Sequence, residues 1–300
     1  MKQLFKNIYN LIPNKLKLIF FYLIKNIFIP PEKLFQHLHF KGYFKIKFMD
    51  QNAYLYSIGT ILENTIFWKG IKNAHEPLSL KIWFFLSCRS DEIIDVGANI
   101  GLYSIVSHMA NYKSKIHAFE PSREFLVALK KIKIKNKIDL SINPFALGDK
   151  EEVVYFDGYR TTSDKKIKNY YSETINSKWK EIKQKKLSKY LEHNNINKID
   201  LIKMDIEKYE YKVLKDIKER IKRDQPNMLI EIINNDEISK NNVNDVIGKI
   251  IKDMNYKIYL IDDKNNIVSR SAIITYSTYW NVLFLNNQSS LAFEKNFAIN

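Results

Sequence analysis

One segment of this chain constrains its fold more than any other: an apolar run that passes through a glycine-containing loop into a helix and then into a second apolar run. Residues 93–96 are typical of a short buried strand, and residues 102–109 repeat apolar side chains at helical spacing. Between them, Gly97 and Gly101 allow a tight turn and a close approach of the backbone to a ligand. Residues 115–119 predict the next strand. Such a strand–helix–strand unit indicates parallel strands in an α/β fold.

The same alternation of strands and helices continues towards the C-terminus. Further strands are predicted at residues 138–142, 200–204, 227–232, 257–261 and 280–285, and apolar helix faces at residues 213–221 and 243–254. The last two strands are expected to pair across a turn at residues 262–266. We therefore predict a Rossmann-like α/β domain with a mostly parallel, doubly wound sheet and an antiparallel C-terminal edge strand.

The chain divides into three predicted parts. Residues 1–41 form a basic amphipathic helical segment, residues 42–90 a β/helix elaboration, and residues 91–290 the main α/β domain. Within the elaboration, residues 43–68 alternate apolar and polar side chains, which predicts short strands with a turn near residues 50–52.

Charge and cysteine content exclude some classes of site. The formal net charge is +15, which favours contact with polyanions, but the lysines are scattered along the whole chain and indicate a solvated lysine-rich surface. Cys88 is the single cysteine, so an intramolecular disulfide and a cysteine-built zinc site are excluded. Because it follows the apolar run at residues 82–86, we expect a buried, inert thiol.

The N-terminal residues 1–31 contain an apolar stretch at residues 16–24 that Lys17 interrupts and Lys25 follows. This stretch is shorter than the roughly 20 apolar residues of a membrane span, and no small-residue cleavage site follows it. Two alternatives stay open: a helix on the inner membrane surface, giving peripheral membrane contact through residues 1–31, or a helix packed on the catalytic domain. The expected location is the cytoplasm, at the inner face of the membrane in the first alternative.

The glycine loop and an acidic residue after the second strand predict the type of cofactor. The loop lacks the G-x-G-x-x-G pattern that accommodates the pyrophosphate of a dinucleotide. S-adenosylmethionine carries no phosphate and needs a carboxylate to hold its ribose. Glu120 follows the strand at residues 115–119, where its side chain can accept hydrogen bonds from both ribose hydroxyls. The loop and Glu120 together favour an S-adenosylmethionine site.

Several motifs in the same order resemble the FkbM-type methyltransferases, which methylate hydroxyl groups on sugars and natural products. The resemblance extends over about residues 42–285. The segments that carry it are ENTIFWKG at 63–70, the loop DVGANIG at 95–101, FEP at 119–121, ALGD at 146–149, KMDIEKYE at 203–210, LIE at 229–231 and VLFL at 282–285. One position departs from the family pattern, because Lys208 stands where the family usually has glycine between two glutamates.

The resemblance implies a class I methyltransferase fold and a set of site residues. The residues expected at the cofactor are Asp95, Gly97, Ala98, Asn99, Gly101, Glu120, Ala146 and Asp205. Asp205 follows a strand at the carboxyl edge of the sheet, and we expect it to be the base that takes the proton of the acceptor hydroxyl, with Glu207 as its helper. Glu63, Glu210 and Glu231 are candidates for the acceptor side, although Glu210 also suits a helix cap. Asp205 and Glu231 are the only candidates for a magnesium ion, which is not the favoured interpretation.

Two rival functions follow from the same residues. The positive charge prompts a nucleic-acid methyltransferase, but the segment after the fourth strand is acidic and lacks the Asn/Asp-Pro-Pro-aromatic pattern of base-amine methylation. We therefore predict no nucleic-acid partner and a small-molecule or glycan acceptor. The second rival is an inactive cofactor-binding scaffold at the membrane. It is suggested by Lys208 in place of the usual glycine and by the basic residues 1–31.

Overall fold

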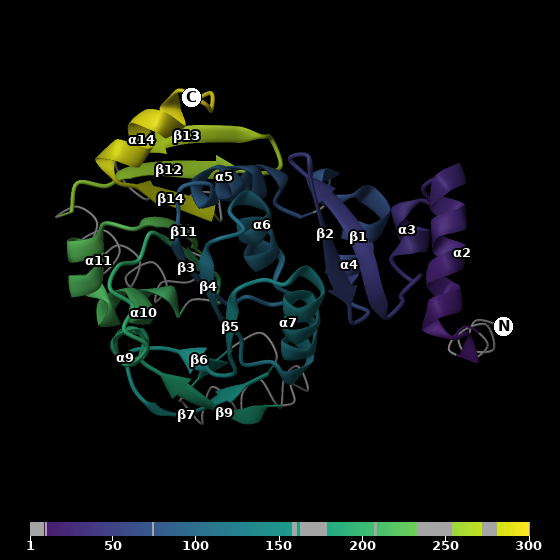
Figure 1. The fold of residues 1–300 in the computed structure, drawn as a ribbon, viewed down its shortest axis with the longest axis horizontal. Helices are drawn as coiled ribbons and strands as arrows, with labels where there is room; N and C mark the ends of the chain where they lie inside the picture. Colours follow the sequence, from purple (N-terminus) through teal and green to yellow (C-terminus); the bar gives the residue numbers. More distant parts are fainter. Residues whose placement is uncertain are drawn as a thin grey trace.

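The computed structural model describes residue 9 and residues 11–73, 75–157, 161–162, 179–206, 209–232, 254–271 and 281–299 (Figure 1). Glu207, Lys208 and nearly all of the helix predicted at residues 243–254 lie outside these ranges.

An eight-stranded sheet forms the centre of the protein, in the order β13-β12-β14-β11-β10-β3-β4-β5 (Figure 1). Its strands are β3 (Glu92–Val96), β4 (Lys115–Phe119), β5 (Leu140–Asn143), β10 (Leu201–Met204), β11 (Asn227–Glu231), β12 (Lys257–Asp262), β13 (Ile267–Ser271) and β14 (Asn281–Leu285). From β5 to β11 all neighbours are parallel, whereas β14 runs antiparallel to both β11 and β12. The predicted mostly parallel sheet with a C-terminal antiparallel strand is confirmed.

The strands at the antiparallel end are arranged differently from our expectation. The turn after β12 leads into β13, which is the edge strand, and does not join β12 to the final strand. β14 instead lies inside the sheet, between β11 and β12. All five residues of β14 are buried, as an interior strand requires, so its apolar side chains are covered on both faces.

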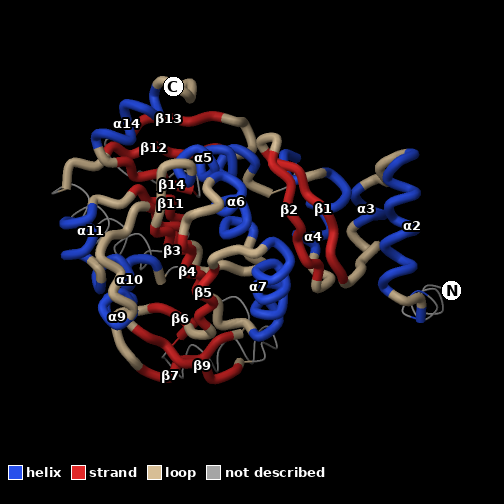
Figure 2. Tube along the Cα trace, in the orientation of Figure 1, coloured by secondary structure: helices blue, strands red, loops and turns tan. Residues whose placement is uncertain are grey.

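Successive side chains of each strand point to opposite faces of the sheet, so they contribute to two separate hydrophobic cores, one on each face. Ile93 and Leu201 belong to one core, and Ile94 and Ile202 to the other. The first face is covered by α5 (Pro77–Ser87), α6 (Leu102–Ala110) and α7 (Arg123–Asn136), and the second by α9 (Leu187–His193), α10 (Glu210–Asp216) and α11 (Lys218–Asp224). Figure 2 shows the strands running between these groups of helices. The helix expected at residues 213–221 is in fact two short helices, α10 and α11.

A smaller four-stranded sheet, in the order β6-β9-β7-β8, lies below the central sheet in Figure 1. Its strands are β6 (Ala146–Leu147), β7 (Glu152–Phe156), β8 (Thr161–Thr162) and β9 (Lys180–Lys185). It follows β5 directly, and its first strand brings Ala146 to the cofactor end of the main sheet.

The N-terminal elements form a third group, at the right of Figure 1. They are α2 (Asn14–Ile27), α3 (Glu32–Phe35), the hairpin of β1 (Gly42–Phe48) and β2 (Gln51–Ser57), α4 (Ile61–Lys69) and the short 3-10 helix η1 (Ile71–Asn73). The predicted hairpin is present, but its turn is at Met49 and Asp50, both with positive φ, and the chain then forms a helix where we expected further strands. Asn136 of α7 fastens the hairpin, because its side chain accepts from the Tyr54 amide and donates to the Tyr54 carbonyl, each at 2.8 Å.

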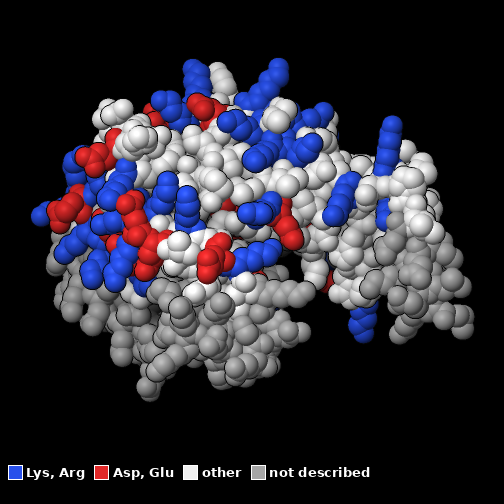
Figure 3. All heavy atoms as spheres, turned by 90° about the horizontal axis from the view of Figure 1, so that it is seen from below, with Lys and Arg blue, Asp and Glu red and all other residues white. Residues whose placement is uncertain are grey.

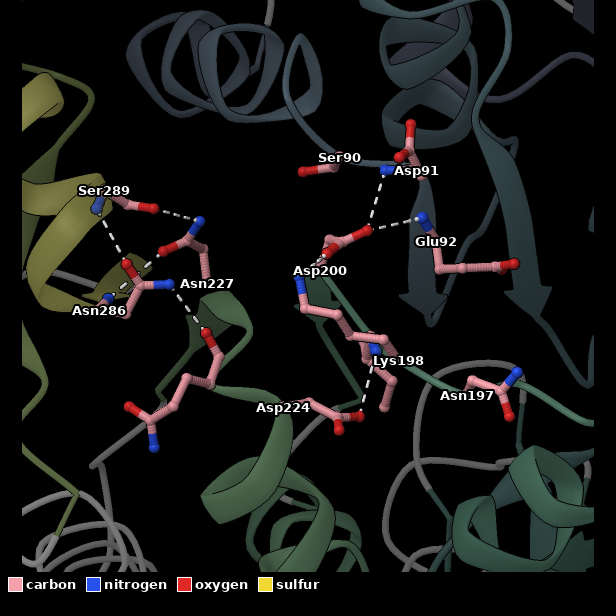
Figure 4. A network of polar contacts seen from close by, with 12 residues as sticks. Ser90, Asp91, Glu92, Asn197, Lys198, Asp200, Asp224, Asn227, Asn286 and Ser289 are labelled. Carbon is pink, nitrogen blue, oxygen red and sulfur yellow. Dashed lines mark hydrogen bonds and ion pairs between the residues drawn. The ribbon is translucent and has the colours of Figure 1, made fainter.

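A polar network closes the end of the sheet opposite to the glycine loop (Figure 4). One carboxylate oxygen of Asp200 accepts from the backbone amides of Asp91 and Glu92, at 3.0 and 3.1 Å, and the other contacts Lys198 at 2.7 Å. Asn227 at the start of β11 donates to Ser289 in α14 (Asn287–Glu294), at 2.9 Å. Asp200 therefore connects the start of β10 to that of β3, and Asn227 connects the start of β11 to α14.

Cys88 differs from the sequence-based expectation. It follows the last residue of α5 and is exposed, so the predicted burial of this thiol is wrong. Its side chain falls on the outer side of α5, whereas Ile82 and Trp83 of the same helix are completely buried.

Candidate cofactor and acceptor site

The loop between β3 and α6 is held against the neighbouring strand by backbone hydrogen bonds. The amides of Gly97 and Ala98 both donate to the carbonyl of Phe119 at the end of β4, at 3.0 and 3.1 Å. The amide of Gly101 then donates to the carbonyl of Ala98 at 2.7 Å and closes the turn before α6. The loop therefore lies at the carboxyl end of the parallel strands, where α/β folds bind their ligands.

Both glycines of this loop are required by the surrounding atoms. Gly97 has φ of 79°, and a Cβ atom there would lie 1.9 Å from the backbone oxygen of Asp205. Gly101 has φ of 82°, and a Cβ would lie 2.4 Å from the side chain of Ile132. Only glycine permits these conformations and distances together. Gly97 thus allows the cofactor loop and the residue after β10 to touch.

Asp95, the fourth residue of β3, lies beneath the loop and is only 1% exposed. Its carboxylate accepts a hydrogen bond of 2.6 Å from the hydroxyl of Ser104 in α6. Burial raises the pKa of Asp95 to about 6. Asp95 therefore connects β3 to α6 beneath the loop and supports the loop conformation. It does not line the cavity that is described below.

Glu120 lies directly after β4 with 5% of its surface exposed. One carboxylate oxygen accepts from the amide of Asn99 at 2.9 Å, and the other from the amide of Ser122 at 2.7 Å. Burial raises the pKa of Glu120 to about 7. Each oxygen keeps a lone pair for a further donor, so this buried carboxylate suits the two hydroxyls of a ribose.

A cavity opens between the glycine loop, Glu120 and the small sheet. It is lined by Val96, Gly97, Asn99, Phe119, Glu120, Pro121, Phe125, Phe145, Ala146, Leu147, Phe156, Asp205 and Ile206. Five of the predicted cofactor residues, namely Gly97, Asn99, Glu120, Ala146 and Asp205, therefore meet around one space. Aromatic and aliphatic walls with a single buried carboxylate fit the adenosine part of S-adenosylmethionine, whose base is apolar on its faces and whose ribose carries the donors.

The carboxyl ends of β10 and β11 bring two further carboxyl groups together. Asp205 follows β10 and Glu231 ends β11, and the parallel register of the two strands sets them side by side. The two carboxyl groups are close enough to interact strongly with each other. Burial and the neighbouring Asp205 raise the pKa of Glu231 far above its usual range. Burial therefore favours the neutral form of Glu231, and Asp205, with 37% of its side chain exposed, is the more accessible member of the pair.

The sequence motifs assign no role to the cation beside this pair. The ammonium of Lys203 is 3.7 Å from Asp205, and the residue is only 1% exposed. Although burial lowers its pKa, the carboxylates of Asp205, Glu76 and Glu231 outweigh burial and raise it. Lys203 is thus a charged lysine in the middle of an otherwise apolar buried strand. A lysine within an apolar strand is unusual, and this feature of the sequence could have identified Lys203 as a residue of the site.

Glu76 was also missed, because it lies in the segment before α5 and far from the motifs in sequence. Its carboxylate accepts a hydrogen bond of 2.7 Å from the hydroxyl of Tyr103. Burial alone would raise the pKa of Glu76, but His75 and Lys203 together hold it well below its usual range. An anionic Glu76 therefore lies near Lys203.

Asn281, at the start of β14, is opposite Glu231 in the antiparallel register, so the two side chains share one face of the sheet. It is 3% exposed, and its side-chain oxygen has no hydrogen-bond partner among the residues that the structure describes. This oxygen therefore lacks the hydrogen bond that buried polar atoms normally make.

The remaining candidates are placed as follows. Glu210 begins α10 and accepts from the amide of Ile206 at 2.7 Å, so it caps the loop after Asp205. Glu63 is completely buried in a capping box at the start of α4, where both its oxygens bind the backbone of Ile58 and Thr60, and it does not line the cavity. Glu207 lies outside the described residues.

Two further points concern His117 and a metal ion. His117 bridges Tyr190 and Glu92 at 2.9 Å each, which is a structural role within the strand layer. Among the described residues no group of three or more histidine, cysteine or acidic side chains could hold a metal ion. The magnesium alternative rested on Asp205 and Glu231 alone.

This geometry defines a class of protein. A mostly parallel sheet with a glycine loop, a buried glutamate after the second strand and a carboxylate after the fourth is the arrangement of an S-adenosylmethionine-dependent methyltransferase. A profile of the methyltransferase FkbM domain matches residues 95–258, which is more than half of the chain. The chain therefore belongs to the FkbM methyltransferase family.

Several solved structures are similar to this chain at low sequence identity. A methyltransferase FkbM from Methylobacillus flagellatus KT is 16% identical, with 66% of this chain and 44% of that chain covered and a TM-score of 0.43. A putative caffeoyl-CoA O-methyltransferase from Staphylococcus aureus is 12% identical, with coverage of 70% and 83% and a TM-score of 0.41. A SAM-dependent O-methyltransferase from Thermotoga maritima is 12% identical, with coverage of 82% and 78% and a TM-score of 0.38. The match spans less than half the length of the Methylobacillus protein, and no curated protein matches this chain.

Proposed function

We propose that this protein transfers the methyl group of S-adenosylmethionine to a hydroxyl group of a sugar or glycan precursor, with Asp205 as the general base. The observation that carries the proposal is the position of Asp205. Its backbone touches the glycine loop, and its side chain belongs to a pair of carboxyl groups at the edge of the cofactor cavity. A base at this place can reach an acceptor that is aligned with the cofactor.

The cofactor would supply an electrophilic methyl group on a sulfonium. The protein must then hold the acceptor oxygen within about 3 to 3.5 Å of the methyl carbon and remove the proton of the hydroxyl group. Asp205 accepts the hydrogen bond of the hydroxyl and takes its proton as the new carbon–oxygen bond forms. Protonated Glu231 donates to Asp205 and fixes its orientation. Lys203 compensates the negative charge of the group.

The polar groups around Asp205 favour a neutral, hydroxyl-bearing acceptor. The carboxylates of Asp205 and Glu76 lie near Lys203, which is itself buried, and Glu231 adds no positive charge. A phosphate-rich acceptor such as nucleic acid would therefore meet more negative than positive charge. The oxygen of Asn281, which has no partner within the described ranges, adds an acceptor for another hydroxyl. Sugars offer several hydroxyls close together, which matches this set of groups. We place the reaction in the cytoplasm, where the cofactor is made.

The test combines cofactor binding with turnover. The purified chain is incubated with S-adenosylmethionine that carries a deuterated methyl group and with surface polysaccharide extracted from a strain that lacks the gene. Mass spectrometry should find a new, heavy methyl ether on a sugar residue. Binding of the cofactor without transfer to any glycan would favour the scaffold alternative that Lys208 prompts, and transfer to nucleic acid would contradict the proposed acceptor.

A further inference from the structure

Helix α2 has two apolar faces, and the described protein covers only one of them. On the inner face, Phe21 is 2% exposed and packs against Phe40 and Trp68, with ring centroids 6.1 and 5.5 Å apart. Lys25 also points inwards, and its ammonium donates to the backbone carbonyl of Phe67. These contacts join α2 to the N-terminal elaboration and not to the α/β domain, on which the sequence-based alternative had placed it.

The outer face of α2 consists of Leu16, Ile19, Phe20, Leu23 and Ile27. Their exposed fractions are 55%, 50%, 59%, 58% and 82%. The spacing of three and four residues places all five on one side of the helix. Single exposed apolar residues are common on soluble proteins, but a continuous stripe indicates a contact surface.

The charge of the N-terminal region is strongly one-sided. Residues 1–31 contain five lysines and no acidic residue, and residues 1–73 contain eleven lysines and three acidic residues. Of these three, Glu63 is buried in its capping box and Glu32 is paired with Lys69 at 2.8 Å. In the view of Figure 3, lysines project among uncharged atoms at the N-terminal end, and most acidic side chains gather at the opposite end. Apolar and basic groups are thus combined with few opposing carboxylates.

We propose that the outer face of α2 inserts into the interface of an anionic lipid membrane. Lipid acyl chains cover the apolar stripe, and acidic headgroups pair with the surrounding lysines. A second copy of the chain fits less well, because it would bring the same lysines and hardly any carboxylate to the contact. Its apolar stripe runs along one side of the helix, so in this proposal α2 lies in the plane of the interface. Among the helices that the structure describes, none has the length and hydropathy of a membrane span.

The test measures binding of the full chain to sedimented vesicles. Vesicles of equal parts phosphatidylglycerol and phosphatidylcholine are compared with vesicles of phosphatidylcholine alone. The variant Leu16→Gln/Phe20→Gln/Leu23→Gln removes the apolar stripe, and Lys15→Glu reverses a charge beside it. The control Val127→Gln/Ile134→Gln removes apolar side chains of α7 that are 46% and 74% exposed. Circular dichroism and S-adenosylmethionine affinity verify that each protein is folded.

We expect the wild type and the control to bind the anionic vesicles, and binding to fall as salt is added. The triple variant should lose about tenfold or more of the partition coefficient, and Lys15→Glu a smaller part of it. Failure of the wild type to bind anionic vesicles, or equal binding by the triple variant, would overturn the proposal. A wild-type dimer that the triple variant breaks, with no vesicle binding, would identify a second copy as the occupant and overturn it as well.

Discussion

Replacing Glu120 with alanine removes a carboxylate that the structure uses twice. It accepts from the amides of Asn99 and Ser122 at 2.9 and 2.7 Å, and in the complex it would also accept from the ribose hydroxyls. Hydrogen bonds to a charged group are worth about 1.5 to 3 kcal/mol, and the loop is held less firmly without them. We therefore expect the dissociation constant of S-adenosylmethionine to rise about tenfold to a hundredfold in Glu120→Ala.

Isothermal titration with S-adenosylmethionine and with its demethylated product measures this change. The matched control is Glu124→Ala, since Glu124 is an exposed glutamate four residues further along the chain. Affinity should be unchanged in the control. If Glu120→Ala stays folded and binds both compounds with wild-type affinity, the assignment of this carboxylate to the ribose is refuted.

Glu120 also predicts a pH dependence of binding. Its pKa is raised to about 7, so the group is protonated below that pH and ionised above it. Because the ribose hydroxyls favour the ionised form, protons compete with the ligand, and affinity should rise from pH 6 to pH 8 by up to about tenfold. The same titration on Glu120→Gln should show this change abolished.

Two further substitutions test the surroundings of the site. Gly97→Ala would place Cβ 1.9 Å from the Asp205 carbonyl oxygen. Gly70 has a similar positive φ of 77°, but no atom lies within 4 Å of where its Cβ would stand. We expect Gly70→Ala to lower the free energy of unfolding, measured by urea denaturation, by about 1 kcal/mol, and Gly97→Ala to lower it by at least about 3 kcal/mol. Equal losses would contradict the close approach of Gly97 to the backbone of Asp205. Lys203→Met leaves the buried carboxylate of Glu76 without a cation that lowers its pKa, so the free energy of unfolding at pH 8 should be about 3 kcal/mol lower than in the wild type. The difference should shrink at acidic pH, where Glu76 loses its charge. A variant as stable as the wild type at pH 8 would show that Lys203 does not compensate Glu76.

The parts of the site that sequence analysis identified depend on local patterns. The strand before Gly97, the helix after Gly101 and the position of Glu120 one strand further on are all expressed in residue spacing. Because each loop of a parallel sheet falls at the same edge, these local units also predict that Glu120 and Asp205 meet there. The cavity brings both residues together as expected.

The parts that were missed depend on contacts between distant segments. Nothing near Glu76 indicates that Tyr103 and Lys203 will surround it, because the contact arises only when the start of α5 packs over the sheet. The same holds for Asn281, which reaches Glu231 only because β14 inserts between two other strands. Strand order of this kind is not encoded in periodicity.

Glu63 shows a local signal that was interpreted differently. Thr60 and Glu63 form the S/T-x-x-E pattern of a capping box, which predicts the start of a helix. We assigned this glutamate to the acceptor side from the family resemblance and expected strands around it. In the structure the capping pattern is satisfied completely, and α4 follows it.

The most direct test of the proposed chemistry is the turnover of Asp205→Asn. Asparagine keeps the size of the side chain and can still hydrogen-bond, but it cannot take the proton of the acceptor at neutral pH. We predict that kcat falls about 10² to 10⁴-fold, while S-adenosylmethionine affinity and the activity of the exposed control Asp139→Asn stay near wild type. Wild-type turnover by Asp205→Asn would contradict the account, because the proton of the acceptor would then leave by a route that does not include Asp205.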